Sequence, residues 1–482
     1  MSEATLRRPL ILAAIMSAMF MIAIEATIVS TAMPQIAAEL GDLHLYSWVF
    51  SSFLLAQTAT TIVFGKLSDL YGRKPILLIG IAIFLVGSLL CGVATSMPVL
   101  IGYRLLQGIG AGSIQPIILT LVGDLYPGRE RGRIQGYLSS VWGISSVLGP
   151  LAGGLIVQHL NWAWVFWINV PLGLAAAALF VRYLHENVAR TSRKVDVAGA
   201  ALFAAAVASL LLALTEFGTS GLLALAGALA CVTCSVLFVL QERRAADPML
   251  AIKLWSRRPI ATANAATLLA GMALIGLTAF LPMYVQGVLG RSALVAGFTL
   301  TAMSFGWPVG AMIAARDLFQ RYGLRGTLLI GGALLPAGSA AMLFLQPGVP
   351  PLVAGVGSLV MGLGMGFLST ASLVLIQGSV GWEERGSATA SNVFARNLGS
   401  TFGATVLGGV LNASLVHGGT SVGFGDIRQL LDHPGQALAD PVVQSALGQS
   451  LHVTFWAMFL ITLFAFAAAA LVPPVPLSQP AE

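Results

Sequence analysis

The feature that most constrains this chain is a succession of apolar stretches, each long enough to cross the hydrocarbon core of a bilayer. One helical crossing needs about 20 mostly apolar residues. We count fourteen such stretches, at approximately residues 10–33, 45–65, 76–95, 98–123, 134–158, 163–184, 197–217, 220–241, 259–285, 293–315, 326–346, 351–377, 387–413 and 450–473. The sequence therefore predicts an all-α polytopic membrane protein with fourteen transmembrane helices.

Composition supports this fold class and excludes others. The chain is 57% hydrophobic and only 9% charged, whereas a soluble protein carries about 25% charged residues. A net charge of +6 is typical of proteins that bind nucleic acid, but the basic residues are dispersed and form no basic block. We expect membrane lipids around the protein and no nucleic-acid partner.

The positions of the basic residues predict the orientation of the spans. Of the 25 Lys and Arg residues, 21 fall at the N-terminus or in alternate loops, which places this side in the cytoplasm. Arg291 and Arg428 are on the opposite side, and Arg104 and Arg396 lie within spans. Both termini are therefore expected in the cytoplasm.

A long-period duplication divides the chain. The glycine run 108–112 recurs at 362–366, and the sequence Glu-Arg-Gly at 130–132 recurs at 384–386, both at an offset of 254 residues. Tyr71 and Gly72 recur as Tyr322 and Gly323 at an offset of 251. We predict an N-terminal six-helix half (1–189), two inserted linker helices (190–248) and a C-terminal six-helix half (249–482), with a substrate site between the halves.

The loop after span 2 carries the first family signature. Residues 65–75 read GKLSDLYGRKP, which resembles the hallmark loop of the major facilitator superfamily. Gly65 permits close helix approach and Gly72 a tight turn. Asp69, with the basic Arg73 and Lys74, forms a candidate cytoplasmic gate that breaks when the halves rock; the alternative is a simple basic cytoplasmic loop.

Two further motifs indicate the fourteen-span drug:proton antiporters of that superfamily. Residues 104–112, RLLQGIGAG, are similar to the span 4 motif with its buried arginine, Arg104. Residues 143–154 resemble the span 5 signature of the antiporters. There, small residues allow close packing and a proline bends the helix; an ordinary packing face is the alternative. The residues of this antiporter helix are Gly143, Gly149, Pro150, Gly153 and Gly154.

Span 1 is similar to the family motif with two departures. In residues 24–34, IEATIVSTAMP, Glu25 stands where the family usually has Asp, and Ser30 where it has Asn. At 161–164, NWAW lacks the arginine that relatives commonly have between the tryptophans, although Asn169-Val-Pro171 fits the pattern. The retained carboxylate preserves proton chemistry on a longer side chain.

Depth along the helices brings two of these charges together. Glu25 lies nine residues, or about 13 Å, below the outer end of span 1, and Arg104 six residues, or about 9 Å, below that of span 4. The two side chains can therefore meet. Our hypothesis is that Glu25 couples transport to protons and that Arg104 regulates it; a static ion pair is the alternative.

Further polar or aromatic side chains within spans are candidates for substrate binding. Arg396 lies about 15 Å deep in span 13 with no obvious acidic partner. Helix packing is an equally good explanation for each of the others. They are Gln57, Gln115, Asn264, Tyr284, Gln286, Trp307, Gln377 and Asn392.

The resemblance implies a proton-coupled efflux antiporter for amphipathic small molecules such as drugs and lipophilic cations. Export of an anionic amphiphile or lipid is the alternative, favoured by Arg104 and Arg396 against one acid. No nucleophile elbow, phosphate loop or metal-ligand spacing is present, so we expect neither an enzyme nor a metal site. If the purified protein moved no solute in response to a pH gradient, a role as a receptor or scaffold would be favoured.

The remaining expectations concern context. We expect a monomer in the cytoplasmic membrane of a bacterium, with the proton as coupling ion and no other cofactor. Residues from about 412 to 450 form the longest stretch outside the predicted spans. The resemblance implies a helical hairpin there, and a solvated loop is the alternative.

Overall fold

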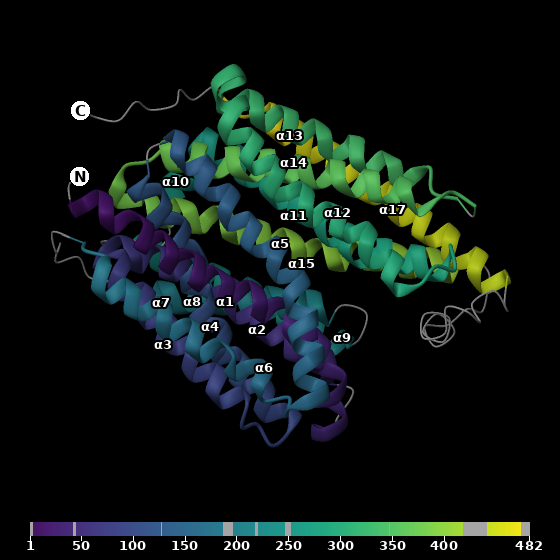
Figure 1. Cartoon of the computed structure of the whole chain (residues 1–482), viewed down its shortest axis with the longest axis horizontal. Helices are drawn as coiled ribbons and strands as arrows, with labels where there is room; N and C mark the ends of the chain where they lie inside the picture. The colour runs from purple at the N-terminus through teal and green to yellow at the C-terminus, as the bar shows by residue number, and fades with distance from the viewer. Residues whose placement is uncertain are drawn as a thin grey trace. The chain divides into compact units, whose positions relative to one another are not determined.

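The computed structural model describes residues 3–41, 45–126, 128–186, 196–216, 220–245, 252–346, 348–417 and 441–473. Within these ranges the protein is helical and contains no strand (Figure 1). The α-helices are α1 (Glu3–Leu40), α2 (Tyr46–Tyr71), α3 (Arg73–Cys91), α4 (Met97–Leu125), α5 (Gly128–His159), α6 (Trp164–Trp167), α7 (Asn169–Tyr183), α8 (Val197–Thr215), α9 (Gly221–Arg244), α10 (Ile252–Ser256), α11 (Arg258–Gly287), α12 (Ala293–Ile313), α13 (Phe319–Leu343), α14 (Pro351–Gly378), α15 (Arg385–His417) and α17 (Pro441–Ala470). A π-helix, η2 (Ala314–Leu318), and a 3-10 helix, η3 (Trp382–Glu384), complete the described elements.

The described helices include 13 that are long and apolar enough to cross a membrane. One of them, Val295–Leu343, has 49 residues, or about 74 Å of helix at 1.5 Å per residue, which is more than twice the thickness of a hydrocarbon core. It overlaps the predicted spans 293–315 and 326–346, and Gly323 interrupts it with a φ of 67°. Each of the fourteen predicted stretches thus overlaps a described helix; 163–184 overlaps two, α6 and α7, and 293–315 and 326–346 share this interrupted one.

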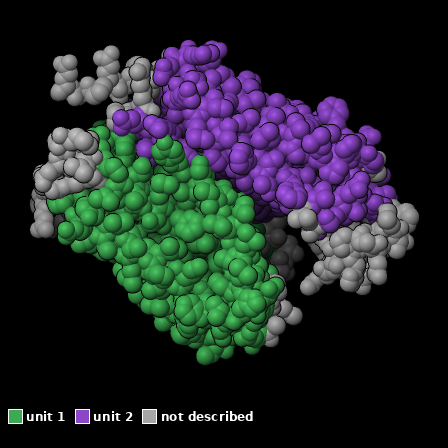
Figure 2. All heavy atoms as spheres, in the orientation of Figure 1, with its two compact units in different colours: residues 1–127, 137–255, 380–394 green, residues 128–136, 256–379, 395–482 purple. Residues whose placement is uncertain are grey.

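Two compact units divide the chain (Figure 2). Unit 1 comprises residues 1–127, 137–255 and 380–394, and unit 2 comprises residues 128–136, 256–379 and 395–482. Helices α5 and α15 each contribute residues to both units. The inserted helices α8 and α9 belong to unit 1. Because the units are not collinear with the repeats, the predicted division into two halves and an insert stays a prediction.

The duplication seen in the sequence reappears as equivalent packing inside each unit. A Cβ added to Gly110 of α4 would lie 2.7 Å from the carbonyl oxygen of Gly80 in α3. One added to Gly364 of α14 would lie 2.9 Å from that of Gly331 in α13. These pairs are related by offsets of 254 and 251 residues. The central helices of both units therefore pack through corresponding glycines.

The π-helix η2 marks a one-residue difference between the repeats. Gln57 of α2 and Trp307 of α12 face corresponding glycines of α4 and α14, an offset of 250 residues. Further along, Gly72 and Gly323 correspond at an offset of 251, and both have positive φ. The five residues of η2, 314–318, lie between these points. Since a π-turn accommodates an inserted residue, η2 explains the change of register.

Candidate functional site

Glu25 is the buried centre of a polar cluster in unit 1. Its side chain is fully buried on α1 between the apolar residues Ile24 and Ile28. Both carboxylate oxygens accept hydrogen bonds. Nη1 of Arg104 donates to Oε1, and Nδ2 of Asn169 donates to Oε2 at 2.5 Å. The contact between Glu25 and Arg104 that the depth argument predicted is therefore present.

Arg104 is held by groups other than Glu25 as well. Its Nε donates to the carbonyl oxygen of Val49 at 3.1 Å, and Nη1 also donates to Oε1 of Gln107 at 2.6 Å. The guanidinium carbon lies 4.3 Å from the centre of the Phe53 ring. Gln107 is in turn fixed by Ser88, whose hydroxyl accepts from Nε2 at 2.7 Å. The arginine thus remains partnered when its bond to Glu25 opens.

The antiporter helix packs tightly on α1 next to Glu25. A Cβ on Gly149 would lie 2.7 Å from Cβ of Thr27, and one on Gly153 would lie 3.1 Å from the carbonyl oxygen of Ile28. Thr27 also donates to the carbonyl oxygen of Ser145 at 3.0 Å. Close packing at Gly149 and Gly153, predicted from the sequence, is confirmed. A Cβ on Gly154 would meet open space, and Pro150 is exposed.

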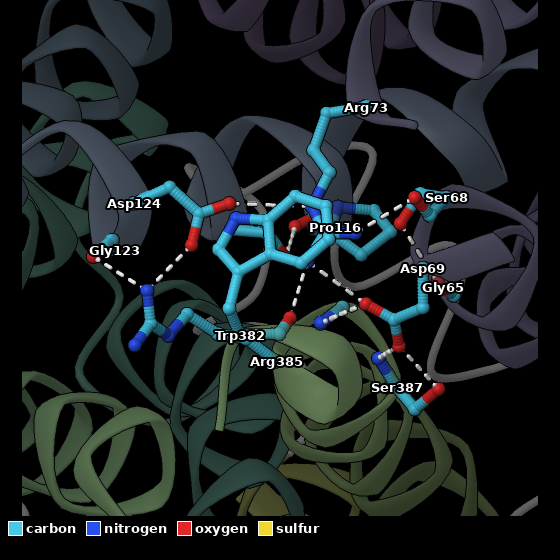
Figure 3. Close-up of polar contacts among 12 residues, drawn as sticks. Gly65, Ser68, Asp69, Arg73, Pro116, Gly123, Asp124, Trp382, Arg385 and Ser387 are labelled. Atoms are coloured by element: carbon cyan, nitrogen blue, oxygen red, sulfur yellow. Dashed lines mark hydrogen bonds and ion pairs between the residues drawn. The ribbon is translucent and has the colours of Figure 1, made fainter. Parts of the chain in front are cut away.

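The loop after α2 forms a second polar cluster, also within unit 1 (Figure 3). Asp69 pairs with Arg73 at 2.9 Å and accepts from the backbone amides of Gly386 at 2.8 Å and Ser387 at 2.7 Å. The Ser387 hydroxyl donates to it as well, at 2.7 Å. A Cβ on Gly65 would lie 3.0 Å from the carbonyl oxygen of Gly386. Asp69 therefore caps the N-terminus of α15, where backbone amides lack helical partners.

Asp124 extends this second cluster. Its Oδ2 accepts from Nε of Arg73 at 3.2 Å and its Oδ1 from Nη1 of Arg385 at 2.6 Å. Arg73 is fully buried, donates to the carbonyl oxygen of Trp382 at 2.8 Å and lies 4.3 Å from the centre of its ring (Figure 3). We call Asp69, Arg73, Asp124, Trp382, Arg385 and Ser387 the inner latch. It joins α2, α3 and α4 of the first repeat to η3 and α15 of the second.

Two residues of the predicted gate, Gly72 and Lys74, lie outside the inner latch. Gly72 has a φ of 96°, as the predicted tight turn requires. Lys74 contributes to the gate differently from the expectation, because its Nζ donates to the carbonyl oxygen of Val181 at 2.8 Å rather than to Asp69. The amides of Arg73 and Lys74 donate to Glu186 at 2.8 and 2.9 Å. Glu186 thus caps α3, as Asp69 caps α15.

The contact that corresponds to the one between Asp69 and Gly386 has different residues in the other repeat. At the position equivalent to Asp69, 251 residues on, stands Gln320, and the glycine equivalent to Gly386 is Gly132. A Cβ on Gly132 would lie 3.0 Å from Cα of Ala315 and 3.1 Å from the ring of Phe319. The corresponding contact in unit 2 is therefore apolar, so the two repeats differ in chemistry at the same structural position.

The candidate substrate residues fall into both units. Gln57, Gln115 and Asn392 belong to unit 1 and are largely buried. Tyr284 of unit 2 donates its hydroxyl to the carbonyl oxygen of Leu345 at 2.8 Å and packs on Phe455, so its polar group is used within the fold. The others in unit 2 are Asn264, Gln286, Trp307, Gln377 and Arg396. Trp307 donates to Ser369 at 3.1 Å.

Arg396 differs from the other charged residues of unit 2. It lies eleven residues after Arg385, the first residue of α15, and is partly buried. Within the described part of the chain, its guanidinium makes no hydrogen bond or ion pair. A charged side chain inside a membrane costs about 2.5–3.5 kcal/mol on insertion scales and marks a functional position by default.

The outer segment predicted at 412–450 is helical at both ends. Helix α15 continues to His417, and α17 begins at Pro441, earlier than the predicted start of the last span. The residues between them, 418–440, are outside the described ranges. The proposed hairpin or loop at this position stays untested.

Sequence reasoning missed several residues of both clusters. In the sequence, Asn169 stands out only as part of a motif, and Asp124 carries no signal of its own. Trp382 and Glu186 carry no signal in the sequence, because their partners are distant along the chain: the Arg73 side chain for Trp382, and the amides of Arg73 and Lys74 for Glu186. The recurrence of Glu-Arg-Gly at 384–386 beside the glycine run was the one available pointer to Arg385.

Two compact units built from a duplicated set of membrane-spanning helices, with a buried ion pair and a polar latch between repeats, define a helical membrane transporter. The chain belongs to the Major Facilitator Superfamily, whose family model matches residues 15–404. It is 35% identical to the multidrug transporter protein MdtP of Bacillus subtilis over 416 residues, covering 84% of this chain and 76% of that protein. It is 36% identical to multidrug resistance protein 3 of the same organism, covering 83% and 78%.

Solved structures support the fold. The human organic anion transporter MFSD10 superposes with a TM-score of 0.64 over 96% of this chain and all of that chain, at 14% sequence identity. At this level of identity the likeness shows the architecture alone. The chain is thus a multi-pass membrane transporter with multidrug transporters among its relatives.

Proposed function

We propose that this transporter exports amphipathic small molecules, including drugs and lipophilic cations, in exchange for protons, with Glu25 as the proton carrier. The observation that carries the proposal is the complete burial of Glu25 with a partner on each carboxylate oxygen. Removal of a carboxyl group from water favours its protonated form, whereas a neighbouring guanidinium favours the charged form. With these effects opposed, access of water to the site decides which form is populated.

The surroundings of Arg104 favour a pair that opens over a static one. Removing one partner of a buried ion pair usually costs about 3–5 kcal/mol, because the other charge is left without a partner. Here Val49, Gln107 and the ring of Phe53 continue to hold the guanidinium. Protonation of Glu25 therefore releases the pair at lower cost, as a cyclic carrier requires.

Alternating access makes proton uptake and proton release by Glu25 occur on opposite sides of the membrane. In a rocker-switch cycle, Glu25 takes up a proton from outside and releases it to the cytoplasm, and the inner latch opens and closes the cytoplasmic side. One elementary charge moving through 100 mV supplies about 2.3 kcal/mol, and one pH unit about 1.4 kcal/mol. One proton per cycle is therefore enough for more than about 100-fold accumulation of a neutral substrate. In a bacterial cytoplasmic membrane such export confers drug resistance.

The test compares Glu25→Gln with wild type in inverted membrane vesicles to which a fluorescent lipophilic cation is added from outside. We expect Glu25→Gln to lose uptake driven by a pH gradient while it retains substrate binding and passive exchange. Glu39→Gln is the matched control, because Glu39 is an exposed carboxylate on the same helix, accepts from Gln35 and Trp162, and lies outside the Glu25 cluster. Uptake by Glu25→Gln equal to that of the control would refute the proposed role.

A second candidate is export of an anionic amphiphile or lipid, favoured by Arg396. Arg104 is paired with Glu25, whereas Arg396 has no partner within the described residues. Of the two arginines within spans, the one with an uncompensated charge is therefore Arg396 of unit 2. Competition separates the two substrate classes. A sulfonated amphiphilic dye that displaces the bound cation from wild type, but not from Arg396→Gln, would support the anionic class; displacement from both would remove Arg396 from substrate binding.

A further inference from the structure

The amide of Asn169 has one polar atom that the described structure leaves unused. Asn169 is fully buried at the first position of α7. Its Nδ2 donates to Oε2 of Glu25 at 2.5 Å, but its buried Oδ1 has no hydrogen-bond partner in the described part of the chain. A buried acceptor without a donor costs free energy, and in a native protein it calls for an explanation.

The chemistry of a protonated Glu25 supplies that explanation. An ionised carboxylate only accepts hydrogen bonds, whereas a carboxylic acid also donates one. Oε1 faces Arg104, which has donors and no acceptor. Gln107 beside it has an acceptor, but its Oε1 already accepts from Nη1 of Arg104 at 2.6 Å and from Sγ of Cys91 at 3.8 Å. A proton on Glu25 is therefore best placed on Oε2, facing Asn169. In the described orientation, however, Asn169 presents its NH2 group to Oε2, so two donors would meet.

We propose that Asn169 responds to protonation of Glu25 by turning its side-chain amide through about 180°. The turn exchanges NH2 for Oδ1, which then accepts the hydrogen bond from the Glu25 O–H group. This inference rests on the proposed role of Glu25 as proton carrier and adds a positioning residue to it. Because an asparagine amide is a donor on one side and an acceptor on the other, it can serve both forms of Glu25 in turn.

The exchange also keeps the two states close in energy. In the ionised state the unpaired atom of the Asn169 amide is an acceptor, and after the turn it is a donor, so neither state satisfies the amide completely.

The other ionisable groups that act within this cluster are Arg104 of α4 and the Cys91 thiol of α3, which is 3.8 Å from Oε1 of Gln107. No further ionisable group from a neighbouring helix acts on Glu25 within the described residues.

The position of Asn169 connects this switch to the outer end of unit 1. It lies two residues after the end of the short helix α6, whose Phe166 is fully buried in the same apolar cluster as Ile24 and Ile28 of α1. The ring of Phe166 also lies 5.9 Å from the guanidinium carbon of Arg104. A change of hydrogen bonding at Asn169 therefore acts where α1, α4 and α7 meet, and a small movement there is transmitted through packed side chains.

Infrared difference spectroscopy of the purified full-length protein tests the inference directly. A pH step across the protonation of Glu25 produces a carboxyl C=O band, which is assigned by its absence in Glu25→Gln. In wild type the O–H group donates to Asn169, which lowers the frequency of this band. Asn169→Leu has a similar size but neither donates nor accepts, so we expect the band to move to higher frequency. Ser88→Ala is the control, because Ser88 reaches Glu25 only through Gln107 and Arg104, and it should leave the band unchanged.

The outcomes separate the two claims. If the band remains in Glu25→Gln, Glu25 is not the group that titrates and the proposed function fails. If the band is lost in Glu25→Gln but has the same frequency in wild type and Asn169→Leu, only the role of Asn169 is refuted. Transport adds a second readout: Asn169→Leu should reduce proton-driven uptake roughly tenfold, the equivalent of one hydrogen bond to a charged group, while passive exchange persists.

A second variant protects the test against misfolding. Asn169→Asp has nearly the same shape as the wild-type residue and places two carboxyl groups in contact, where they share one proton because both cannot ionise easily. We expect the proton uptake that accompanies the pH step in wild type to be at least halved over the same pH range. Wild-type uptake by this variant would overturn the proposed contact between Asn169 and the Glu25 proton.

Discussion

Replacing Asp69 by alanine should expose the first turn of α15 to solvent. The backbone amides at a helix N-terminus have no intrahelical partners, and those of Gly386 and Ser387 donate to Asp69 at 2.8 and 2.7 Å. Hydrogen bonds to charged groups contribute about 1.5–3 kcal/mol each. We take about 3 kcal/mol for the pair of amides, since water replaces part of the loss. That difference corresponds to an increase in amide exchange rate of roughly 100-fold.

The rest of the inner latch should survive this change. Arg73 keeps its bonds to Asp124, to the carbonyl oxygen of Ser68 and to that of Trp382. No buried arginine is left without a partner, so the transporter should still fold. Asp69→Asn retains an acceptor oxygen and should raise the exchange rate by no more than about tenfold, because asparagine caps helices nearly as well as aspartate.

Hydrogen exchange measured by mass spectrometry on peptides covering residues 382–390 provides the assay. The matched control is Gln320→Ala, the equivalent position in the second repeat, where the packing against Gly132 is apolar. Exchange at residues 130–136 should stay within about twofold of wild type in this control. If Asp69→Ala leaves exchange at Gly386 and Ser387 unchanged, these amides are protected by another group, and the proposed latch is wrong.

Three further predictions concern Gly149, the π-helix η2 and Glu25. Gly149→Val should abolish transport while the purified protein remains monodisperse, because its side chain would overlap Thr27 of α1 next to Glu25; transport at the wild-type rate would contradict this. Because η2 absorbs one inserted residue, deleting Ala315 should convert it to α-helix while the residues after it keep their register, so the melting temperature should stay within a few degrees of wild type; a variant that no longer folds would refute that account. With Glu25 as sole carrier, exchange of a monovalent cation for one proton should be electroneutral in proteoliposomes, whereas currents implying two or more protons per cycle would reject the single carrier.

Much of the fold was predictable because the bilayer imposes one strong rule on the sequence. Apolar runs of fixed minimum length located the helices, and the asymmetric basic residues predicted their orientation. The contact between Glu25 and Arg104 was also predictable, since depth along two helices follows from residue counts. The close packing at Gly149 and Gly153 followed from their spacing of one helical turn.

The latch and the register change required the structure. Asp124 and Arg385 are 261 residues apart, and neither helix length nor hydropathy brings two particular helix ends together. The π-helix η2 shifts the offset between repeats by one residue, which sequence matching reveals only where both copies share a motif. The substrate-binding residues stay a prediction, because an isolated polar residue within a span serves helix packing as well as ligand binding. Asn169 was missed since its significance lies in an unused atom, Oδ1, which no sequence pattern records.

The central claim, that Glu25 carries the coupling proton, is tested most directly by comparing two modes of transport in the same proteoliposomes. Counterflow measures exchange of labelled for unlabelled substrate without a proton gradient, and accumulation measures uptake driven by one. Glu25→Gln should retain counterflow at close to the wild-type rate and lose accumulation, while Glu39→Gln keeps both. Accumulation by Glu25→Gln under a pH gradient would contradict the account.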